Sequence, residues 1–149
     1  MNNNFMEVKF KAVSENESFA RVCAAAFCLQ LNPSLNDITD IKTAVSEAVT
    51  NCVVHAYPYK IGDVILRVDI IENMVKITIS DNGIGIKDFN KAREPFYTTK
   101  RGEERSGMGF SVMESFMDNL ELEKNGDRGL RVILTKQIVK KAIAVGEEC

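Results

Sequence analysis

The sequence is poor in the residues that build metal centres and disulfide frameworks. Its one histidine, His55, would leave a histidine-based zinc site short of ligands. The four cysteines show no C-x-x-C spacing and lie mostly within apolar patterns, where cysteine behaves as a small hydrophobic residue. We therefore expect structural or inert thiols, and no metal ion held by protein side chains alone.

Long apolar runs are also missing. The first residues contain no basic segment followed by an apolar run, and no stretch reaches the roughly 18 apolar residues of a membrane-spanning helix. The 19 Lys and Arg residues nearly balance the 21 Asp and Glu residues, so the net charge of −2 gives no general attraction to nucleic acid or anionic membranes. We expect a soluble cytoplasmic protein that binds small molecules or proteins, and not nucleic acid or membranes.

What the sequence does contain is enough apolar material for one core. The chain has 149 residues, of which 45% are hydrophobic, and it shows no repeat, linker or low-complexity segment. We predict a single domain over residues 1–149, with residues 137–149 as a frayed tail.

Hydrophobic periodicity predicts an α+β fold in which three main helices pack on one sheet. Strands are expected at residues 5–13, 64–71, 74–80, 120–124 and 130–136, and helices at residues 14–31, 36–55 and 109–119. The first strand is expected at a sheet edge, and the second and third form a hairpin. The predicted apolar stripe of the first helix is Phe19, Val22, Cys23, Ala26, Phe27 and Leu31. Residues 87–105 are polar and irregular, which is typical of a loop.

Two pairs of glycines indicate a ligand that carries phosphate. Gly83 and Gly85 follow Asp81 at the end of a predicted strand, and Gly107 and Gly109 open a predicted helix. Glycine lets backbone N–H groups approach an anion, and a helix N-terminus favours negative charge. Taken alone, the first pair is equally consistent with a plain turn.

Two common nucleotide-binding motifs fit these glycines less well. A dinucleotide-binding fingerprint follows the first strand of a parallel unit and opens a helix directly, whereas here a hairpin precedes Gly83 and an irregular loop follows Gly85. A Walker phosphate loop is excluded because neither glycine pair is followed by Lys-Ser or Lys-Thr.

Glu47 and Asn51 are four residues apart in a predicted helix, which places a carboxylate and a carboxamide on one face. Such a pair is often only a solvated face. Beside two phosphate-binding turns, the carboxylate can position a hydroxyl nucleophile and the carboxamide oxygen can hold Mg²⁺. Arg105, just before Gly107, is a candidate phosphate ligand because a guanidinium group binds phosphate bidentately. His55 is interpreted as a capping or core histidine.

Three motifs, in this order, resemble the ATP-binding fold shared by histidine kinases, type II topoisomerases and heat-shock chaperones: Glu47-x-x-x-Asn51, Asp81-x-Gly83-x-Gly85 and Gly107-x-Gly109. The chain resembles one branch more closely, the anti-sigma factor F kinases of spore-forming bacteria, through residues 16–22, 41–43, 46–51, 96–100 and 104–110. The resemblance covers residues 5–140. It implies a two-layer α/β sandwich of the Bergerat type, with a mixed, mostly antiparallel sheet and about three helices on one face.

The resemblance also implies a role for each matching position. Asp81 would accept a hydrogen bond from the adenine amino group, Asn51 would hold Mg²⁺ against the phosphates, and Glu47 would act as base toward a serine hydroxyl. Arg105 would neutralise charge on the γ-phosphate. The other residues expected to bind ATP (or ADP) are Gly83, Gly85, Thr99, Lys100, Gly107, Met108 and Gly109.

Two exclusive protein partners follow from the same resemblance. One is a sporulation sigma factor, held inactive by a homodimer, and the other is an anti-anti-sigma factor whose serine accepts the phosphate. Arg21, on the polar face of the first helix, is the expected interface residue. The related kinase of a general-stress sigma factor and a nucleotide-gated binding protein without catalysis remain alternatives. A sensor histidine kinase is disfavoured because no dimerising helical hairpin with a phosphoacceptor histidine is found in the sequence.

The chain departs from this family next to the last strand. Leu130 and Arg131 follow Gly129, where relatives often carry two threonines whose hydroxyls support the adenine site. The sequence therefore leaves open which groups support Asp81.

Overall fold

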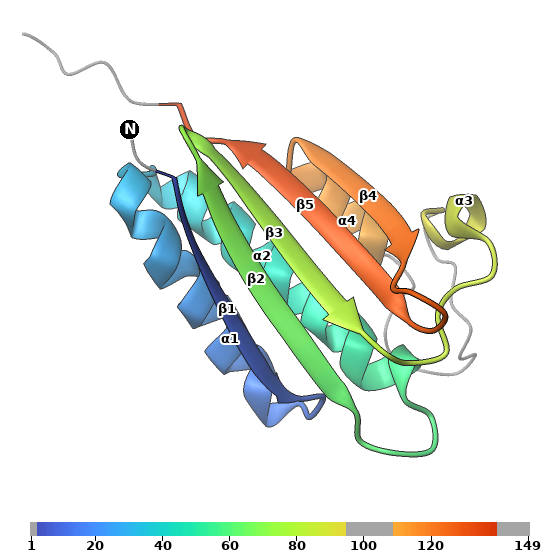
Figure 1. Cartoon of the computed structure of the whole chain (residues 1–149). Coiled ribbons are helices and arrows are strands. Elements are labelled where there is room, and N and C mark those ends of the chain that lie inside the picture. Colours follow the sequence, from blue (N-terminus) through green and yellow to red (C-terminus); the bar gives the residue numbers. More distant parts are fainter. Residues whose placement is uncertain (1–2, 95–108, 140–149) are drawn as a thin grey trace, which may run out of the picture.

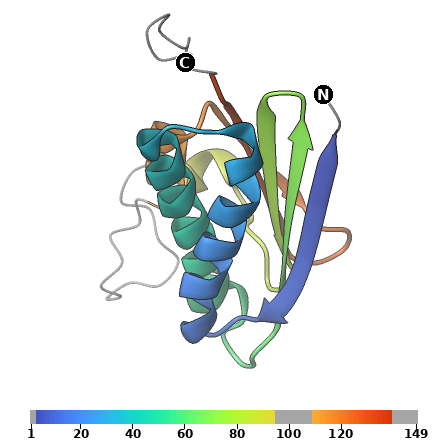
Figure 2. The ribbon, with the colours of Figure 1, turned by 90° about the vertical axis from the view of Figure 1, so that its left-hand side faces the viewer.

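The computed structural model describes residues 3–94 and 109–139 of the chain. These residues form two layers, an open five-stranded sheet and a layer of helices that covers one of its faces (Figure 1 and Figure 2). The strands are β1 (Asn4–Lys11), β2 (Asp63–Ile71), β3 (Met74–Asp81), β4 (Asn119–Lys124) and β5 (Leu130–Gln137). The helices are α1 (Glu15–Cys28), α2 (Leu35–Asn51), the short α3 (Phe89–Ala92) and α4 (Gly109–Phe116). The predicted α+β sandwich is confirmed, with α1, α2 and α4 on one face of the sheet.

The sheet is antiparallel throughout the part of the chain that the structure describes. Its strand order is β1-β2-β3-β5-β4, and every neighbouring pair is antiparallel, so the expected admixture of parallel pairing is not found there. β1 lies at an edge and β2 and β3 form a hairpin, as predicted. Buried and partly exposed residues alternate along β2, β3 and β5, which places one face of these strands against the helices.

The predicted apolar stripe of the first helix is confirmed only in part. Leu31, just beyond α1, is buried and Phe27 packs against the core, as predicted, but the rest of the buried face of α1 differs. Its buried residues are small, namely Ala20, Ala24, Ala25 and Cys28. Phe19 and Val22, which the periodicity places in the core, are 51% and 54% exposed. A shift of one residue turns the buried face by about 100° around a helix. Small side chains let α1 approach its neighbours closely, so close packing selects alanine where hydropathy favours the larger residues.

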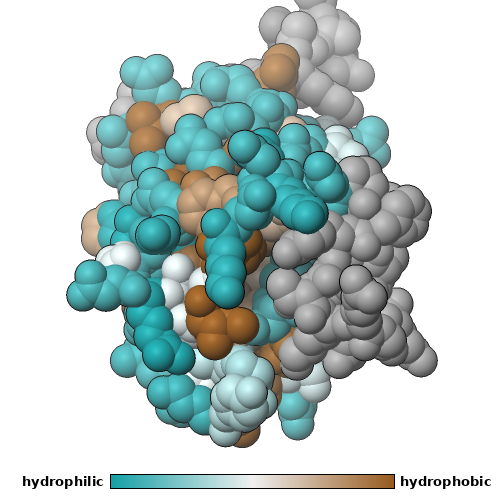
Figure 3. All heavy atoms as spheres, turned by 90° about the vertical axis from the view of Figure 1, so that its right-hand side faces the viewer, coloured by the Kyte–Doolittle hydropathy of each residue, from teal (hydrophilic) through white to brown (hydrophobic). Residues whose placement is uncertain are grey.

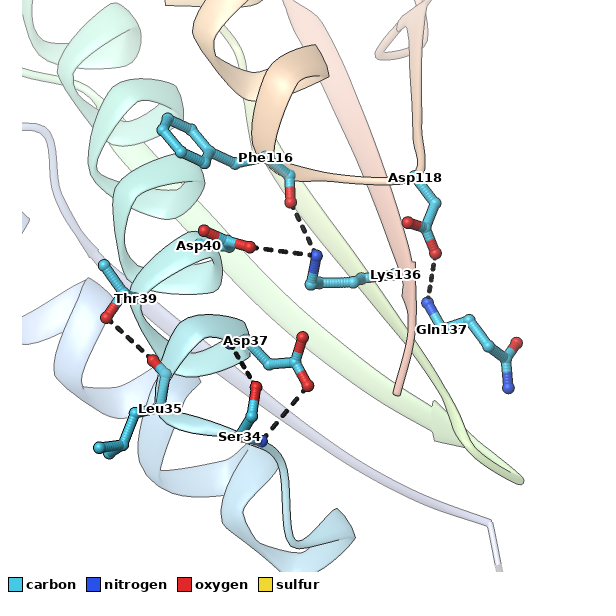
Figure 4. A network of polar contacts seen from close by, with 9 residues as sticks. All are labelled: Ser34, Leu35, Asp37, Thr39, Asp40, Phe116, Asp118, Lys136 and Gln137. Carbon is cyan, nitrogen blue, oxygen red and sulfur yellow. Dashed lines mark hydrogen bonds and ion pairs between the residues drawn. The ribbon is translucent and has the colours of Figure 1, made fainter. Parts of the chain in front are cut away.

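α2 is the central helix and packs against both α1 and α4. A capping box begins it. The Ser34 hydroxyl accepts a hydrogen bond from Asp37 N–H at 3.0 Å, and the Asp37 carboxylate accepts one from Ser34 N–H at 3.3 Å (Figure 4). The predicted apolar face is buried along Ile41, Val45, Ala48 and Val49. After Asn51 the chain continues as a π-helical turn, η2 (Cys52–Ala56).

Lys136 connects the sheet to two of the helices. Its side chain points from β5 toward the helical layer, where Nζ lies 2.9 Å from the Phe116 carbonyl oxygen and 3.4 Å from the Asp40 carboxylate (Figure 4). The side chain is only 11% exposed, so both contacts form in surroundings of low polarity. Beside it, Asp118 accepts a hydrogen bond from Gln137 N–H at 2.6 Å. These contacts fix the C-terminal end of α4, whose opposite end lies at the candidate site.

Two segments predicted to be irregular contain regular structure. The predicted loop at residues 87–105 includes α3, which Asp88 caps by accepting a hydrogen bond from Lys91 N–H at 3.0 Å. The start of the predicted frayed tail at residue 137 is wrong, because Gln137 belongs to β5 and Ile138 is buried. Among the described residues, no helix has the length and apolar character needed to cross a bilayer.

Candidate functional site

Asp81 ends β3 with its carboxylate buried against other segments, and the residue is 4% exposed. Its Oδ1 accepts hydrogen bonds from Gly83 N–H at 2.9 Å and Leu130 N–H at 3.2 Å, and the Cys52 thiol donates to Oδ2 at 3.5 Å. Burial raises the pKa of Asp81 above its usual value, and these three bonds offset part of that rise. The result is a buried acceptor held in one orientation at a strand end.

Leu130 supports Asp81 through its backbone. A threonine hydroxyl is absent at this position, and the amide of Leu130 itself donates to the carboxylate. Thr135 takes no part, because it pairs near the opposite end of β3. Arg131 donates to Asn125 Oδ1 at 2.9 Å, and Asn125 Nδ2 donates to the Asp81 carbonyl oxygen at 2.8 Å. In this chain the Leu130 amide thus supports the carboxylate of Asp81, and the Arg131–Asn125 pair supports its backbone carbonyl.

The turn after Asp81 packs on the segment that follows α2. Ile84 N–H donates to the Ala56 carbonyl oxygen at 2.9 Å, and a Cβ at Gly83 would overlap that same carbonyl. Gly85 adopts φ 73°, in the left-handed region that favours glycine. Packing therefore requires glycine at 83 and backbone conformation favours it at 85, while their contact with a purine stays a prediction.

Asn51 and Gly109 meet where α4 begins beside the end of α2. A Cβ at Gly109 would lie 3.1 Å from both Oδ1 and Nδ2 of Asn51, which is tighter than an ordinary contact. Glycine therefore lets the N-terminus of α4 approach the carboxamide. The first N–H groups of a helix have no partner within it and attract anions. The fold thus brings together Asn51 and Gly109, two residues that are predicted to act on the phosphates.

Glu47 lies one helical turn before Asn51 and lines a groove between α1 and α2. The groove has a volume of about 330 Å³, and its lining residues are Arg21, Thr39, Lys42, Thr43, Ser46 and Glu47. Arg21, the residue predicted to contact a partner, therefore shares a surface with the predicted base. The buried Ser46 Oγ has no hydrogen-bond partner within residues 3–94 and 109–139. The groove can accept a polar group next to Glu47.

Several predicted site residues fall between α3 and α4, outside the described residues. They are Thr99, Lys100, Arg105, Gly107 and Met108. In the described part of the chain, no group of three or more His, Cys, Asp or Glu residues could hold a metal ion.

On the side of the molecule that carries α3 and the β4–β5 turn, the surface is mostly hydrophilic with hydrophobic side chains between (Figure 3).

Sequence reasoning missed two residues that hold the Asp81 end of the site. Cys52, predicted as a structural or inert thiol without a named partner, follows Asn51 directly and contacts Asp81. Burial raises the pKa of the Cys52 thiol well above its usual value, so the thiol stays protonated and can donate. Tyr57, which the sequence did not single out, accepts from Asn82 N–H at 2.7 Å and donates to the Asp63 carbonyl oxygen at 2.6 Å. Nothing in the sequence indicated the contact of Cys52 with Asp81 or the contacts of Tyr57.

Solved structures of other proteins share this fold. The catalytic domain of histidine kinase ThkA matches with a TM-score of 0.56 and 19% identity, over 91% of this chain and 96% of that one. The RsbU and RsbW domains of Rv1364c from Mycobacterium tuberculosis match with a TM-score of 0.65 and 16% identity, over 91% of this chain and 32% of that one. At such identities the likeness shows the fold alone.

Sequence comparison is more specific. A family model described as a histidine kinase-like ATPase domain matches residues 10–136. The anti-sigma F factor of Caldanaerobacter subterraneus subsp. tengcongensis is 54% identical over 136 residues, which cover 91% of this chain and 95% of the relative. The anti-sigma F factor of Bacillus licheniformis is 47% identical over 138 residues, which cover 92% and 94%. The chain therefore belongs to the histidine kinase-like ATPase family and, within it, to the anti-sigma F factors.

Proposed function

We propose that this chain is an ATP-dependent protein serine kinase that also acts as an anti-sigma factor. It binds and inhibits a sporulation sigma factor, and it phosphorylates a serine of an anti-anti-sigma antagonist. The observation that carries the proposal is that Asn51 meets Gly109 while Cys52, the next residue, touches Asp81. The relatives named anti-sigma F factor support the class of partner.

The described residues fit both the adenine base and the phosphates of Mg-ATP. Asp81 Oδ2 is a buried acceptor that suits the adenine amino group. The Asn51 amide oxygen is the kind of hard ligand that Mg²⁺ takes together with phosphate oxygens and water. The missing Cβ at Gly109 leaves the N-terminus of α4 close to Asn51, where N–H groups would bind phosphate. Bound Mg²⁺ supplies neutralisation of phosphate charge.

We assign the base of phosphate transfer to Glu47. Its carboxylate takes the proton of the acceptor serine hydroxyl, the serine oxygen bonds to the γ-phosphorus, and the bond to the β–γ bridging oxygen breaks to release ADP. A positioned base of this kind contributes roughly 10²–10⁴-fold in rate. Arg105 would stabilise charge on the phosphoryl group, and Thr99, Lys100, Gly107 and Met108 would complete the ATP contacts.

Partner binding is assigned to the groove between α1 and α2. Arg21 and Glu47 line it together, so a protein that docks on α1 can present a serine to the base. We place Arg21 in the partner interface on this ground. The kinase is proposed to act as a cytoplasmic homodimer without direct contact to nucleic acid or membrane.

The test is to incubate the full chain with γ-labelled ATP, Mg²⁺ and a candidate anti-anti-sigma factor, and then to locate the label. Phosphoserine on the antagonist supports the kinase. Label on histidine, or nucleotide-dependent partner binding without label, overturns the proposed activity. Glu47→Gln should abolish labelling, whereas Glu121→Gln, at an exposed position on β4, is a matched control that should retain it. Capture of a general-stress sigma factor in preference to a sporulation sigma factor would overturn the choice of partner.

A further inference from the structure

The two oxygens of the Asp81 carboxylate have different surroundings. Oδ1 accepts two backbone hydrogen bonds, from Gly83 and Leu130, at 2.9 and 3.2 Å. A carboxylate oxygen has two lone-pair positions, so these amides occupy Oδ1. Oδ2 accepts from the Cys52 thiol at 3.5 Å and keeps one position for another donor. Oδ2 is therefore the oxygen that can receive a ligand amino group.

Cys52 orients that oxygen. The residue is 3% exposed at the start of η2, and its thiol donates to Oδ2, the oxygen that keeps a position for another donor. Rotation of the carboxylate would break the thiol bond as well as the two amide bonds. The thiol therefore adds to the free energy needed to rotate the Asp81 carboxylate and turn Oδ2 away from a ligand.

Tyr57 holds the turn that carries the carboxylate. Its hydroxyl accepts from Asn82 N–H at 2.7 Å and donates to the Asp63 carbonyl oxygen at 2.6 Å, which links the end of β3 to the start of β2. One residue earlier, the Ala56 carbonyl accepts from Ile84 N–H at 2.9 Å. The segment after α2 thus contacts Asp81 and each side of the turn that follows it.

We propose that Cys52 and Tyr57 form a base-reading clamp, a pair of positioning residues that aims Asp81 Oδ2 at the exocyclic amino group of a bound purine. This inference rests on the proposed nucleotide site and adds to it the residues that set base preference. Neither residue of the clamp is proposed to touch the phosphates or to take part in phosphate transfer.

Each variant is tested with two nucleotides that differ in the exocyclic amino group of the base. Affinity is measured calorimetrically for ATP and for purine riboside triphosphate, which lacks the exocyclic amino group. Because a hydrogen bond to a charged acceptor is worth more than a neutral one, the full chain should prefer ATP by about tenfold or more. Cys52→Ala should weaken ATP binding about 3- to 10-fold and leave the analogue within about twofold, since only the amino group uses Oδ2.

Two further variants separate positioning from packing. Cys52→Ser keeps a donor and should restore part of the preference for ATP. Tyr57→Phe keeps the ring and removes the hydroxyl, and it should also lower the ATP preference, by about two- to fivefold. Cys28→Ala removes another buried thiol, in α1, and should leave the ratio of the two affinities unchanged.

The outcomes distinguish the clamp from the nucleotide site itself. Equal weakening of both nucleotides in Cys52→Ala and in Tyr57→Phe would show that these residues only pack, and would overturn the clamp. If the unaltered chain binds both nucleotides equally, Asp81 does not read the base, and the proposed adenine contact fails together with the clamp. Selective loss of ATP affinity in both variants supports the proposal.

Discussion

The two ends of the candidate site differ in how they are built. At the base end, formed by Asp81 and its partners, a buried carboxylate is held by Gly83, Leu130 and Cys52 from three separate segments. At the phosphate end, formed by Glu47, Asn51 and Gly109, Asn51 lies against Gly109 and Glu47 lines an open groove. This difference suggests different roles for the base end and the phosphate end. In our proposal the base end, held by several hydrogen bonds, selects the ligand, and the groove beside Glu47 receives a second protein.

The strongest way to separate the two ends is Glu47→Gln. Loss of the base should lower phosphate transfer by about 10²–10⁴-fold, because proton removal from the acceptor hydroxyl is lost. ATP affinity should stay within about threefold of the unaltered chain, since a neutral amide of the same shape replaces the carboxylate. Single-turnover transfer and calorimetry, measured on the same preparation, check both statements. Undiminished transfer would remove Glu47 as the base.

Asn51→Ala should act on affinity instead. Removal of the amide oxygen takes away the protein ligand proposed for Mg²⁺, and the affinity for Mg-ATP should fall by about 100-fold. Adenosine, which has no phosphate, should bind as before because the base end is untouched. Calorimetry with both ligands tests this contrast, and wild-type affinity for Mg-ATP would refute the role of Asn51.

Arg21→Glu should leave both ends intact and weaken protein binding. Reversal of charge in the groove should lower the affinity for the sigma factor and for the anti-anti-sigma factor by about tenfold or more, because an interface arginine is replaced by a repelling group. Nucleotide affinity serves as the internal control. If both partners bind the variant at wild-type strength, Arg21 lies outside the interface.

Asp81→Asn is expected to have the smallest effect of the four variants, a change in stability whose size depends on pH. The folded-state pKa of Asp81 is raised by burial, so the stability that this group contributes is present below its unfolded pKa and is lost as pH rises through the folded value. Asparagine does not ionise. The stability of Asp81→Asn relative to the unaltered chain should therefore be greater at about pH 8 than at about pH 4. Urea unfolding at both pH values is the measurement, and an equal difference at the two would contradict the assignment.

Residues adjacent in sequence were the predictable part of this protein. The regular apolar face specifies α2 locally, and the four-residue spacing puts Glu47 and Asn51 on the same helix, whereas the Ser34–Asp37 cap was not predicted. Asp81 was placed at a strand end by alternation alone. In contrast, the buried face of α1 depends on how closely two layers approach, and hydropathy does not encode that distance.

The partners of Asp81 were beyond local reasoning for a different reason. Leu130 reaches the carboxylate because β3 and β5 pair in one particular register, and its contribution is a backbone amide that is independent of side-chain identity. Cys52 reaches it from a segment 29 residues earlier, through a π-helical turn that no pattern signalled. A tertiary contact of this kind follows from the assembled fold.

The central claim is that one nucleotide spans both ends of the site. Titration of Mg-ATP into isotopically labelled protein, followed by the amide resonances of Leu130 beside Asp81 and Gly109 beside Asn51, tests it directly. The account predicts that both resonances shift along a single saturation curve, and that adenosine shifts Leu130 while leaving Gly109 in place. Shifts confined to one of the two amides, or two curves with different midpoints, would contradict a single pocket.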